Sequence, residues 1–394
     1  MPLPPLCSPG PPLTRDQITR YSRHVLLAQL GRTGQQRLRN ARVLVMGAGG
    51  LGAPILQYLA AAGVGHLGVV DDDVVEISNL QRQVIHRADA VGQPKVDSAR
   101  SFVAALNDEV GFTGYHLRMD ESNAAEILSG YDLVIDGTDN FPTRYLVSDV
   151  CAALGKPVVW GSILRFNAQV AVFWSSPPEA ARPDGAPYPP VTLRDLYPVP
   201  PPEGTTPSCG EAGVLGAMCG QVGSLMAAEA IKLITGIGEP LLGRVAVLDV
   251  LAARWHEVEL RPAAPELRAA PAPAPAAAPH GPQIGVSELA ALLAARDRGE
   301  ADFVLVDVRE ETEREIATIP GAVSLPLSRL LANPATAARE AELDSARRIL
   351  LHCLAGGRAR RAQAALQELD LAATAVAGGV REWAATIDPD TPTY

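Results

Sequence analysis

The sequence of 394 residues lacks the cysteine pairs of a disulfide-rich or zinc-binding protein. Its five cysteines, at positions 7, 151, 209, 219 and 353, are widely scattered and form no C-x-x-C pair. We therefore expect neither a zinc knuckle nor a disulfide framework. Scattered thiols in a cytosolic enzyme are more often buried or catalytic than bridged.

Long apolar runs and an excess of basic residues are missing as well. No uninterrupted apolar run approaches the roughly 20 residues of a membrane-spanning helix, although 47% of the residues are hydrophobic. The opening MPLPPLCSPGPPL has neither the positive flank nor the apolar core of a secretion signal, so we interpret residues 1–13 as a disordered arm. A net charge of −10 argues against a dedicated nucleic-acid binder. We expect a cytoplasmic protein that binds neither nucleic acid nor a membrane.

A proline-rich segment divides the chain in two. In residues 261–283, 16 of 23 residues are alanine or proline, which predicts a linker that would reach roughly 70 Å if fully extended. Residues 14–260 and 284–394 both alternate apolar strand-like runs with helical stretches. This alternation predicts a Rossmann-like α/β domain with a mixed sheet, followed by a smaller α/β domain. A second proline-rich stretch, residues 177–207, is expected to form a long mobile excursion.

Glycines near the start predict a nucleotide loop. The segment RVLVMGAGGLGAPILQYLAAAG offers a strand, a G-x-G-x-x-G turn at Gly47, Gly49 and Gly52, and a helix. Such a turn lets backbone amides at a helix N-terminus meet phosphate charge. Asp71 closes the next strand, where a carboxylate can hold a ribose hydroxyl. Taken alone, this is a fingerprint of NAD binding, and glycines that merely turn the chain are the alternative.

The residues that follow favour a triphosphate. Arg82 and Lys95 lie just beyond the expected ribose carboxylate, and two cations suit a triphosphate under nucleophilic attack. Asp139 and Asn140 follow the apolar strand that ends near Asp136, at the edge where open parallel sheets bind ligands. Asp139 could hold Mg²⁺ there. Helix capping is the alternative for Asp139 and Asn140.

Four motifs, GAGGLG, SNLQRQ, VGQPKV and DGTDN, occur in an order and spacing that resemble the MoeB/ThiF family of ubiquitin-activating-like adenylyltransferases. The resemblance covers nearly all of residues 14–260. It implies that ATP with Mg²⁺ activates the C-terminal glycine of a ubiquitin-like sulfur carrier protein, and that Arg82 and Asp139 are catalytic. It also implies that Arg23 reaches into the partner subunit's site of a homodimer. With the glycine loop, the implied ATP site comprises Gly47, Gly49, Gly50, Asp71, Ser78, Asn79, Arg82, Lys95, Asp139 and Asn140.

Acyl-adenylate formation needs no general base, because a carboxylate is already a nucleophile. The lack of a histidine or tyrosine base among these motifs is therefore expected. Cys209 precedes an apolar helix, whose amides would stabilise a thiolate, and the family assigns the matching cysteine thioester or persulfide roles. A loop thiol without an essential role is the alternative. Cys219, inside that helix, is interpreted as a small buried hydrophobe. Many relatives hold zinc with two C-x-x-C pairs that this sequence lacks, so we predict no zinc site.

The C-terminal segment predicts a sulfur site. Cys353 begins a six-residue turn, with Gly356 inside it, that closes at Arg358 on a helix N-terminus. Successive amides in such a turn form an anion nest, and with Arg358 they should stabilise a persulfide anion. The DVRE and IPGA segments and the terminal GG with Trp383 resemble a rhodanese domain across residues 284–394. The alternatives are a rhodanese-like phosphatase, whose loop is one residue longer, and an inactive binding module, which usually lacks the cysteine.

Together these features resemble fusions of an adenylyltransferase and a sulfurtransferase. The hypothesis is that ATP activates a carrier and that persulfide sulfur on Cys353 then forms a thiocarboxylate, with Cys209 in an assisting role. The resemblance implies a cysteine desulfurase or thiosulfate as the sulfur donor. Three rivals stay open: a dehydrogenase with a fused sulfur domain, an enzyme that conjugates a ubiquitin-like protein through a Cys209 thioester, and a non-enzymatic adaptor.

Overall fold

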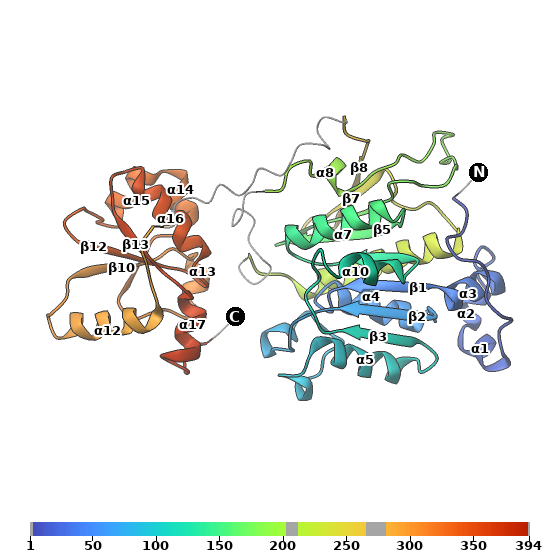
Figure 1. The fold of residues 1–394 in the computed structure, drawn as a ribbon, viewed down its shortest axis with the longest axis horizontal. Coiled ribbons are helices and arrows are strands. Elements are labelled where there is room, and N and C mark those ends of the chain that lie inside the picture. Colours follow the sequence, from blue (N-terminus) through green and yellow to red (C-terminus); the bar gives the residue numbers. More distant parts are fainter. Residues whose placement is uncertain (1–2, 202–211, 265–280, 393–394) are drawn as a thin grey trace. The chain divides into compact units, whose positions relative to one another are not determined.

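The computed structural model describes residues 3–201, 212–264 and 281–392, which form two compact units. The N-terminal unit contains an eight-stranded sheet and the C-terminal unit a five-stranded sheet (Figure 1). This confirms the prediction of two α/β folds, the first with a mixed sheet. Most of the expected linker, and residues 202–207 of the expected excursion, lie outside the described residues.

The larger sheet has the strand order β3-β2-β1-β4-β5-β6-β7-β8. Strands β1 to β5 pair in parallel, and β5 to β8 pair antiparallel. Because the order reverses between β1 and β4, their C-terminal ends form the point where such sheets bind ligands. The bounds are β1 (Arg42–Met46), β2 (His66–Val70), β3 (Gly111–Tyr115), β4 (Leu133–Asp136), β5 (Val158–Leu164), β6 (Asn167–Phe173), β7 (Arg244–Asp249) and β8 (Arg254–Glu259).

Helices cover this sheet through the crossovers between its parallel strands. Right-handed crossovers place α4 and α5 on one face and α6 and α7 on the other, and α4 indeed contacts α5 while α6 contacts α7. The helices of the unit are α1 (Arg15–Arg20), α2 (Ser22–Val25), α3 (Gly31–Asn40), α4 (Gly52–Ala61), α5 (Lys95–Leu106), α6 (Ala124–Ser129), α7 (Phe141–Ala153), α8 (Leu193–Leu196) and α10 (Gly216–Thr235), with short 3-10 turns at η1 (Ile77–Asn79) and η2 (Ala88–Ala90).

Helix α10 is long and apolar enough, by length and composition, to cross a membrane, a feature that the sequence analysis did not anticipate. Of its most apolar 18-residue window, 56% is buried inside the unit. The helix packs on α4 and on strand β5, and its middle carries the small residues Gly220 and Gly223. Burial of this kind is typical of the core helix of an α/β unit.

The N-terminal arm differs from the disordered segment expected over residues 1–13. Leu3 and Cys7 are buried against the core of the unit. The Leu6 amide donates to the carbonyl of Leu233, 2.9 Å away, at the end of α10. Burial raises the pKa of the Cys7 thiol to about 12, with Asp132 adding to the effect. The prolines restrict the arm to extended backbone, and its few apolar side chains are enough to dock it.

The excursion also packs in its described part. Val191 and Leu193 are fully or almost fully buried, and the Trp174 amide donates to the carbonyl of Val191 at 2.8 Å. Arg194 forms a two-point ion pair with Asp149 of α7, with distances of 2.9 and 2.8 Å. Residues 177–201 are therefore held by α7 and by the end of β6, whereas the sequence predicts a mobile loop there.

The smaller sheet is entirely parallel, in the order β11-β10-β12-β13-β9. Helices α14, α15 and α16 pack on one side of it and α12 and α17 on the other (Figure 1), so that two apolar clusters form. The bounds are β9 (Gln283–Ile284), α12 (Val286–Asp297), β10 (Phe303–Asp307), α13 (Glu311–Arg314), β11 (Ala322–Ser324), α14 (Leu327–Ala332), α15 (Pro334–Glu340), β12 (Arg348–His352), α16 (Gly357–Gln367), β13 (Ala373–Val376) and α17 (Gly379–Thr386).

Gly236 tests whether the docked arm contributes to stability. It ends α10 with a φ of +72°, and a Cβ there would lie 2.7 Å from the backbone nitrogen of Pro5. Gly236→Ala should lower the free energy of unfolding by about 2 kcal/mol, because left-handed strain of roughly 1 kcal/mol is added to displacement of the arm. Gly185→Ala is the control, since Gly185 also has a positive φ of +85° but has nothing within 4 Å of its added Cβ. Equal losses in urea unfolding would show that the arm contributes nothing.

Candidate active sites

The glycine loop connects β1 to α4 as the sequence predicts. Gly47 follows β1 with a φ of +88°, a conformation that a side chain would strain. A Cβ on Gly52 would lie 1.9 Å from the carbonyl oxygen of Gly47. The loop can therefore turn this tightly only with glycine at position 52. Its backbone amides lead into the N-terminus of α4, where anions are favoured.

Asp71 holds this loop. The Ala48 amide donates to Asp71 Oδ2 at 2.8 Å, and the Asp73 amide donates to Oδ1 at 2.9 Å. Burial raises the pKa of Asp71, whereas the charge of Lys95 and these amide hydrogen bonds act to lower it. Both carboxylate oxygens thus already bind backbone amides, and the proposed contact of Asp71 with a ribose stays a prediction.

The two predicted cations, Lys95 and Arg82, have different partners. Lys95 is the first residue of α5, and its Nζ lies 2.7 Å from Asp73 Oδ2; the Lys95 side chain is only 7% exposed. Arg82 donates from Nη1 to the carbonyl of Ser78 at 3.0 Å. A Cβ on Gly50 would lie 3.5 Å from Cγ of Arg82, so the structure brings Arg82 against the glycine loop.

The remaining residues of the SNLQRQ motif form a local turn. Asn79, at the end of η1, is buried, and its Oδ1 accepts from the Glu76 amide at 3.2 Å. Ser78 donates from Oγ to Glu76 Oε2 at 3.3 Å. These contacts shape the turn that presents Arg82. Direct binding of phosphate by Ser78 or Asn79 stays a prediction.

Asp139 and Asn140 follow strand β4, and of these two described residues only Asn140 has a side-chain hydrogen bond to a helix. Both side chains are exposed after β4. Asn140 is the N-cap of α7, because its Oδ1 accepts from the Thr143 amide at 2.9 Å. The structure therefore shows for Asn140 the capping role that the sequence left open. Asp139 precedes this cap at the C-terminal edge of the sheet, where an exposed carboxylate fits Mg²⁺ chemistry.

Arg144 anchors the segment that carries Asp139, a role that the sequence analysis missed. Its Nε and Nη2 donate to the carbonyl of Thr138 at 2.9 and 2.7 Å. From the other side, Asp136 Oδ1 accepts from the Thr138 amide and hydroxyl at 3.0 and 2.7 Å. Burial raises the pKa of Asp136, and the charge of Arg144 opposes that effect. The sequence shows Arg144 in the TRY segment, but it does not show that the guanidinium turns inward to the carbonyl of Thr138.

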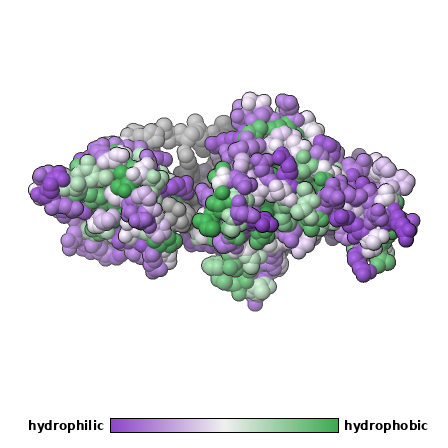
Figure 2. Space-filling view, turned by 90° about the horizontal axis from the view of Figure 1, so that it is seen from below, coloured by the Kyte–Doolittle hydropathy of each residue, from purple (hydrophilic) through white to green (hydrophobic). Residues whose placement is uncertain are grey.

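Arg23 lies in α2 with its side chain exposed. Further along the same segment, Leu26 is 72% and Leu27 is 54% exposed. Hydrophilic residues predominate on the face of the surface seen in Figure 2, and apolar ones gather in small separate areas. Exposed apolar side chains beside a cation are compatible with an interface. The contact of Arg23 with a partner subunit stays a prediction.

Of the two cysteines Cys209 and Cys219, the structure describes only Cys219. Cys209 lies outside the described residues, so its role stays a prediction. Cys219 is buried in α10, in agreement with its interpretation as a small buried residue. A Cβ on Gly50 would lie 2.9 Å from Sγ of Cys219. The thiol therefore packs directly beneath the glycine loop.

Cys353 lies between β12 and α16 in the C-terminal unit. The Gly356 amide donates to Sγ of Cys353 at 3.0 Å, and Gly356 has a φ of +97°. The side chain of Cys353 is nearly fully buried. One amide of the turn thus donates to the sulfur at a helix N-terminus, and binding of a persulfide by several amides stays a prediction.

The two glycines Gly378 and Gly379 let a second helix, α17, approach the turn that holds Cys353. The Val380 amide donates to the carbonyl of Cys353 at 2.9 Å, and the Arg381 amide donates to that of Leu354 at 3.0 Å. A Cβ on Gly379 would lie 2.1 Å from the carbonyl oxygen of Cys353. Glycine is therefore required where α17 approaches the cradle, and this explains the motif physically.

Arg358, in the first turn of α16, is held by an acidic residue that the sequence analysis did not single out. Its Nη1 and Nη2 lie 2.5 and 2.7 Å from the two carboxylate oxygens of Glu313 in α13. Glu313 Oε2 also accepts from the Glu310 amide at 3.0 Å. Stabilisation of a persulfide by Arg358 stays a prediction. In that prediction the guanidinium of Arg358 faces the persulfide while it remains paired with Glu313.

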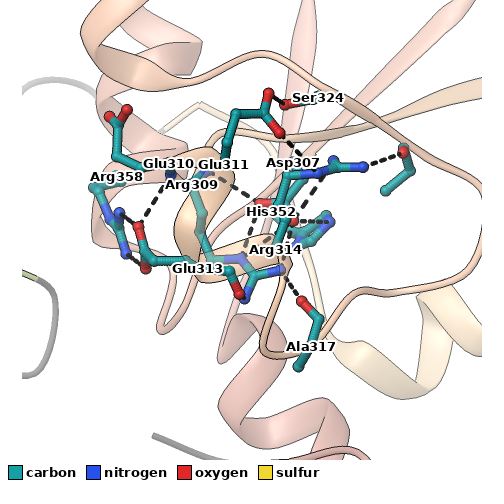
Figure 3. A network of polar contacts seen from close by, with 11 residues as sticks. Asp307, Arg309, Glu310, Glu311, Glu313, Arg314, Ala317, Ser324, His352 and Arg358 are labelled. Atoms are coloured by element: carbon teal, nitrogen blue, oxygen red, sulfur yellow. Dashed lines mark hydrogen bonds and ion pairs between the residues drawn. The ribbon is translucent and has the colours of Figure 1, made fainter.

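The DVRE motif forms a buried support for this ion pair (Figure 3). Asp307 and Arg309 are fully buried and paired at 2.6 Å. Arg309 also donates to the carbonyls of Ala317 at 2.7 Å and of Glu313 at 3.4 Å. Burial disfavours the charge on Asp307, but the hydrogen bonds from Arg309 and the nearby cationic charge outweigh it and lower the pKa of Asp307. The motif therefore fixes the backbone that presents Glu313 to Arg358.

His352 lies directly before the cysteine and is completely buried. Its Nε2 is 3.7 Å from Asp307 Oδ2, beyond the usual hydrogen-bond distance. Burial lowers the pKa of His352 to about 4 although Asp307 opposes the effect. The ring is therefore neutral beneath the cradle at physiological pH.

Comparison with known families identifies both units. The ThiF family matches residues 21–269, and the rhodanese-like domain family matches residues 288–386. The chain belongs to the ThiF family and carries a rhodanese-like domain after the ThiF part. The resemblances stated from the sequence motifs are thereby confirmed.

Relatives of known class match over the full length. The chain is 45% identical over 404 residues to the probable adenylyltransferase/sulfurtransferase MoeZ of Mycobacterium tuberculosis, which covers 100% of this chain and 99% of the relative. It is 37% identical to the adenylyltransferase and sulfurtransferase MOCS3-1 of Zea mays, over 98% of this chain and 86% of the relative. The prediction of an enzyme with both activities is confirmed.

Other matches cover the N-terminal part. The sulfur carrier protein adenylyltransferase of Thermus thermophilus is 50% identical over 63% of this chain and 89% of its own length. Among solved structures, PaaA has a TM-score of 0.53 at 23% identity, over 64% of this chain and 76% of its own. The structure of E. coli MccB with ATP has a TM-score of 0.50 at 22% identity, over 62% and 71%. These structural likenesses establish the fold.

His352 predicts a pH dependence of stability in the C-terminal unit. The unfolded chain takes up the His352 proton near the ordinary pKa of about 6.5, whereas the folded chain resists protonation down to about 4. Stability should therefore be complete above pH 6.5 and fall by up to about 3 kcal/mol as the pH drops toward 4. Hydrogen exchange of peptides from β10 and β12 measures this loss.

His352→Leu should remove that part of the pH dependence whatever its effect at neutral pH. His256→Leu, at an exposed position in β8, should leave the dependence unchanged. An acid loss of protection that persists in His352→Leu would show that another group is responsible.

Proposed function

We propose that the chain uses ATP and Mg²⁺ to adenylate the C-terminal glycine of a ubiquitin-like sulfur carrier protein, and then converts it to a thiocarboxylate with sulfur from a Cys353 persulfide. The observation that carries the proposal is the presence, in one chain, of a glycine loop with adjacent cations and of a thiol on a backbone amide at a helix N-terminus. Relatives named for both activities over the whole length support it.

In the first step a carboxylate oxygen of the carrier attacks the α-phosphorus of ATP and pyrophosphate leaves. The reaction requires positioning and charge neutralisation rather than a base. Arg82 already lies against the loop, and Lys95 is held by Asp73. Asp139, which is exposed after β4, would hold Mg²⁺, and the ion would neutralise phosphate charge.

In the second step the terminal sulfur of the Cys353 persulfide attacks the acyl carbonyl and AMP leaves, which gives an acyl disulfide. A thiol then attacks Sγ of Cys353 and releases the thiocarboxylate. If that thiol is Cys209, a disulfide between Cys209 and Cys353 remains, and a small thiol reductant must reopen it. A donor such as thiosulfate or a cysteine desulfurase then restores the persulfide.

The setting of this reaction is part of the proposal. We propose a cytoplasmic homodimer in which Arg23 serves the partner subunit's site, supported by the exposed side chains of Leu26 and Leu27 nearby. The product would feed the biosynthesis of molybdenum cofactor, thiamine or a related sulfur-containing compound. We further propose that the chain needs no zinc, which stoichiometric zinc in elemental analysis of purified protein would contradict.

Two substitutions separate the steps. Cys353→Ala should retain carrier-dependent exchange of pyrophosphate into ATP but abolish thiocarboxylate, because only the second step uses the thiol. Asp139→Ala should lower both by about a hundredfold or more, because phosphate charge is then less well neutralised. Intact mass of a carrier, after incubation with ATP, Mg²⁺ and thiosulfate, measures the replacement of one oxygen by one sulfur.

Cys151→Ala is the matched control, since Cys151 is a buried thiol of α7 and should be dispensable for both steps. Each candidate carrier is tested in turn. Replacement on one carrier identifies the partner, and replacement on none would contradict the proposal. A stable covalent bond from the carrier to Cys209, passed on to other proteins, would instead favour the conjugation alternative.

A further inference from the structure

His86 contacts the glycine loop from outside every motif assigned to nucleotide binding. It lies between η1 and η2, and its side chain is buried. One ring nitrogen, Nε2, lies 2.9 Å from the carbonyl oxygen of Ala48 in the loop. The other, Nδ1, lies 2.9 Å from Oγ of Ser98 in α5.

The partners of His86 determine its tautomer. A carbonyl oxygen can only accept, so Nε2 must carry the proton that is donated to Ala48. Nδ1 then accepts from the hydroxyl of Ser98, which can rotate to donate. Burial, followed by the charge of Lys95, lowers the pKa of His86, although the Ala48 hydrogen bond opposes this. One neutral tautomer therefore satisfies both ring nitrogens.

Ala48 is thereby held at both of its backbone groups. Its amide donates to Asp71 at 2.8 Å, and its carbonyl accepts from His86. Ala48 stands between Gly47 and Gly49, two residues with little intrinsic restriction of their backbone. A loop built around such glycines needs outside contacts if its amides are to point in one direction before a ligand arrives.

The same histidine connects the loop to a predicted phosphate cation. Ser98 lies three residues after Lys95 in α5, so both lie on one face of the helix. The Ser98–His86–Ala48 chain therefore sets the distance between the loop amides and the helix turn that carries Lys95. A buried histidine generally needs partners for both ring nitrogens, and for His86 these partners are the loop itself and the helix that carries Lys95.

We infer that His86 is a positioning residue for the phosphates of ATP, acting through the carbonyl of Ala48. The inference rests on the proposed adenylation. His86 touches no reacting atom; it orients the loop amides toward the phosphates. Loss of its hydrogen bond should weaken ATP binding, and an amide that restores the donor should recover it.

The test is ATP binding by the full chain, measured by calorimetry with Mg²⁺ present. His86→Leu should raise the Kd for ATP about tenfold, because a loop held by one fewer buried hydrogen bond must be ordered by the ligand. His86→Gln, whose Nε2 can still donate to Ala48, should recover most of the affinity. Ser98→Ala, which keeps the ring but removes its anchor, should raise the Kd less.

His66→Leu is the matched control. His66 is also a partly buried histidine at the same sheet, and its Nε2 lies 3.0 Å from the hydroxyl of Thr113, away from the loop. It should lose stability without a change in the Kd for ATP. If His86→Leu does not fold, Ser98→Ala decides the question, because it keeps the ring and removes only its anchor; an unchanged Kd for ATP in Ser98→Ala would then overturn the role of His86.

The outcomes separate the two proposals. Unchanged ATP binding in His86→Leu, or equal weakening in His86→Leu and His86→Gln, would overturn the role of His86 while leaving adenylation intact. If His86→Leu and His66→Leu weaken ATP binding equally, the effect comes from a general loss of stability, and the role of His86 is overturned as well. Absence of ATP binding by the unsubstituted chain would overturn both the adenylation proposal and the role of His86.

Discussion

Two close backbone approaches, each possible only where a side chain is missing, determine where the two candidate sites form. In the N-terminal unit the start of α4 lies against the carbonyl of Gly47, and in the C-terminal unit the start of α17 lies against the carbonyl of Cys353. In each case a Cβ would come within about 2 Å of a backbone oxygen, well inside contact distance. The glycines at positions 52 and 379 are therefore steric requirements for amides to converge at these strand ends.

Charged residues at both sites are held by opposite charges before any ligand binds. Lys95 is paired with Asp73, and the two terminal nitrogens of Arg358 pair with the two carboxylate oxygens of Glu313. Such pairing orients a long side chain and lowers the entropy lost on binding. An anion that approached either cation would have to compete with this carboxylate, which disfavours stray anions.

At both sites, buried polar residues fix the backbone that presents the candidate binding groups, but the residue types differ. Beneath the cradle, the ion pair of Asp307 and Arg309 is buried completely and fixes the turn that presents Glu313. Beneath the glycine loop, the neutral ring of His86 and the carboxylate of Asp71 fix Ala48. In both units the residues that touch the expected ligand are thus held by buried polar neighbours, which restrict the number of conformations they can adopt.

The sequence alone determined the fold classes, the two families and the residues that begin each loop, because periodicity, glycine spacing and strand ends are local properties of the chain. Tertiary structure decided the partners: Arg358 meets Glu313 across 45 residues of sequence, and His86 meets Ala48 across 38. It also decided that Asn140 caps α7 and that the arm with Leu3 docks. Such pairings depend on which elements the fold brings side by side, and local sequence patterns do not specify which distant residues will meet.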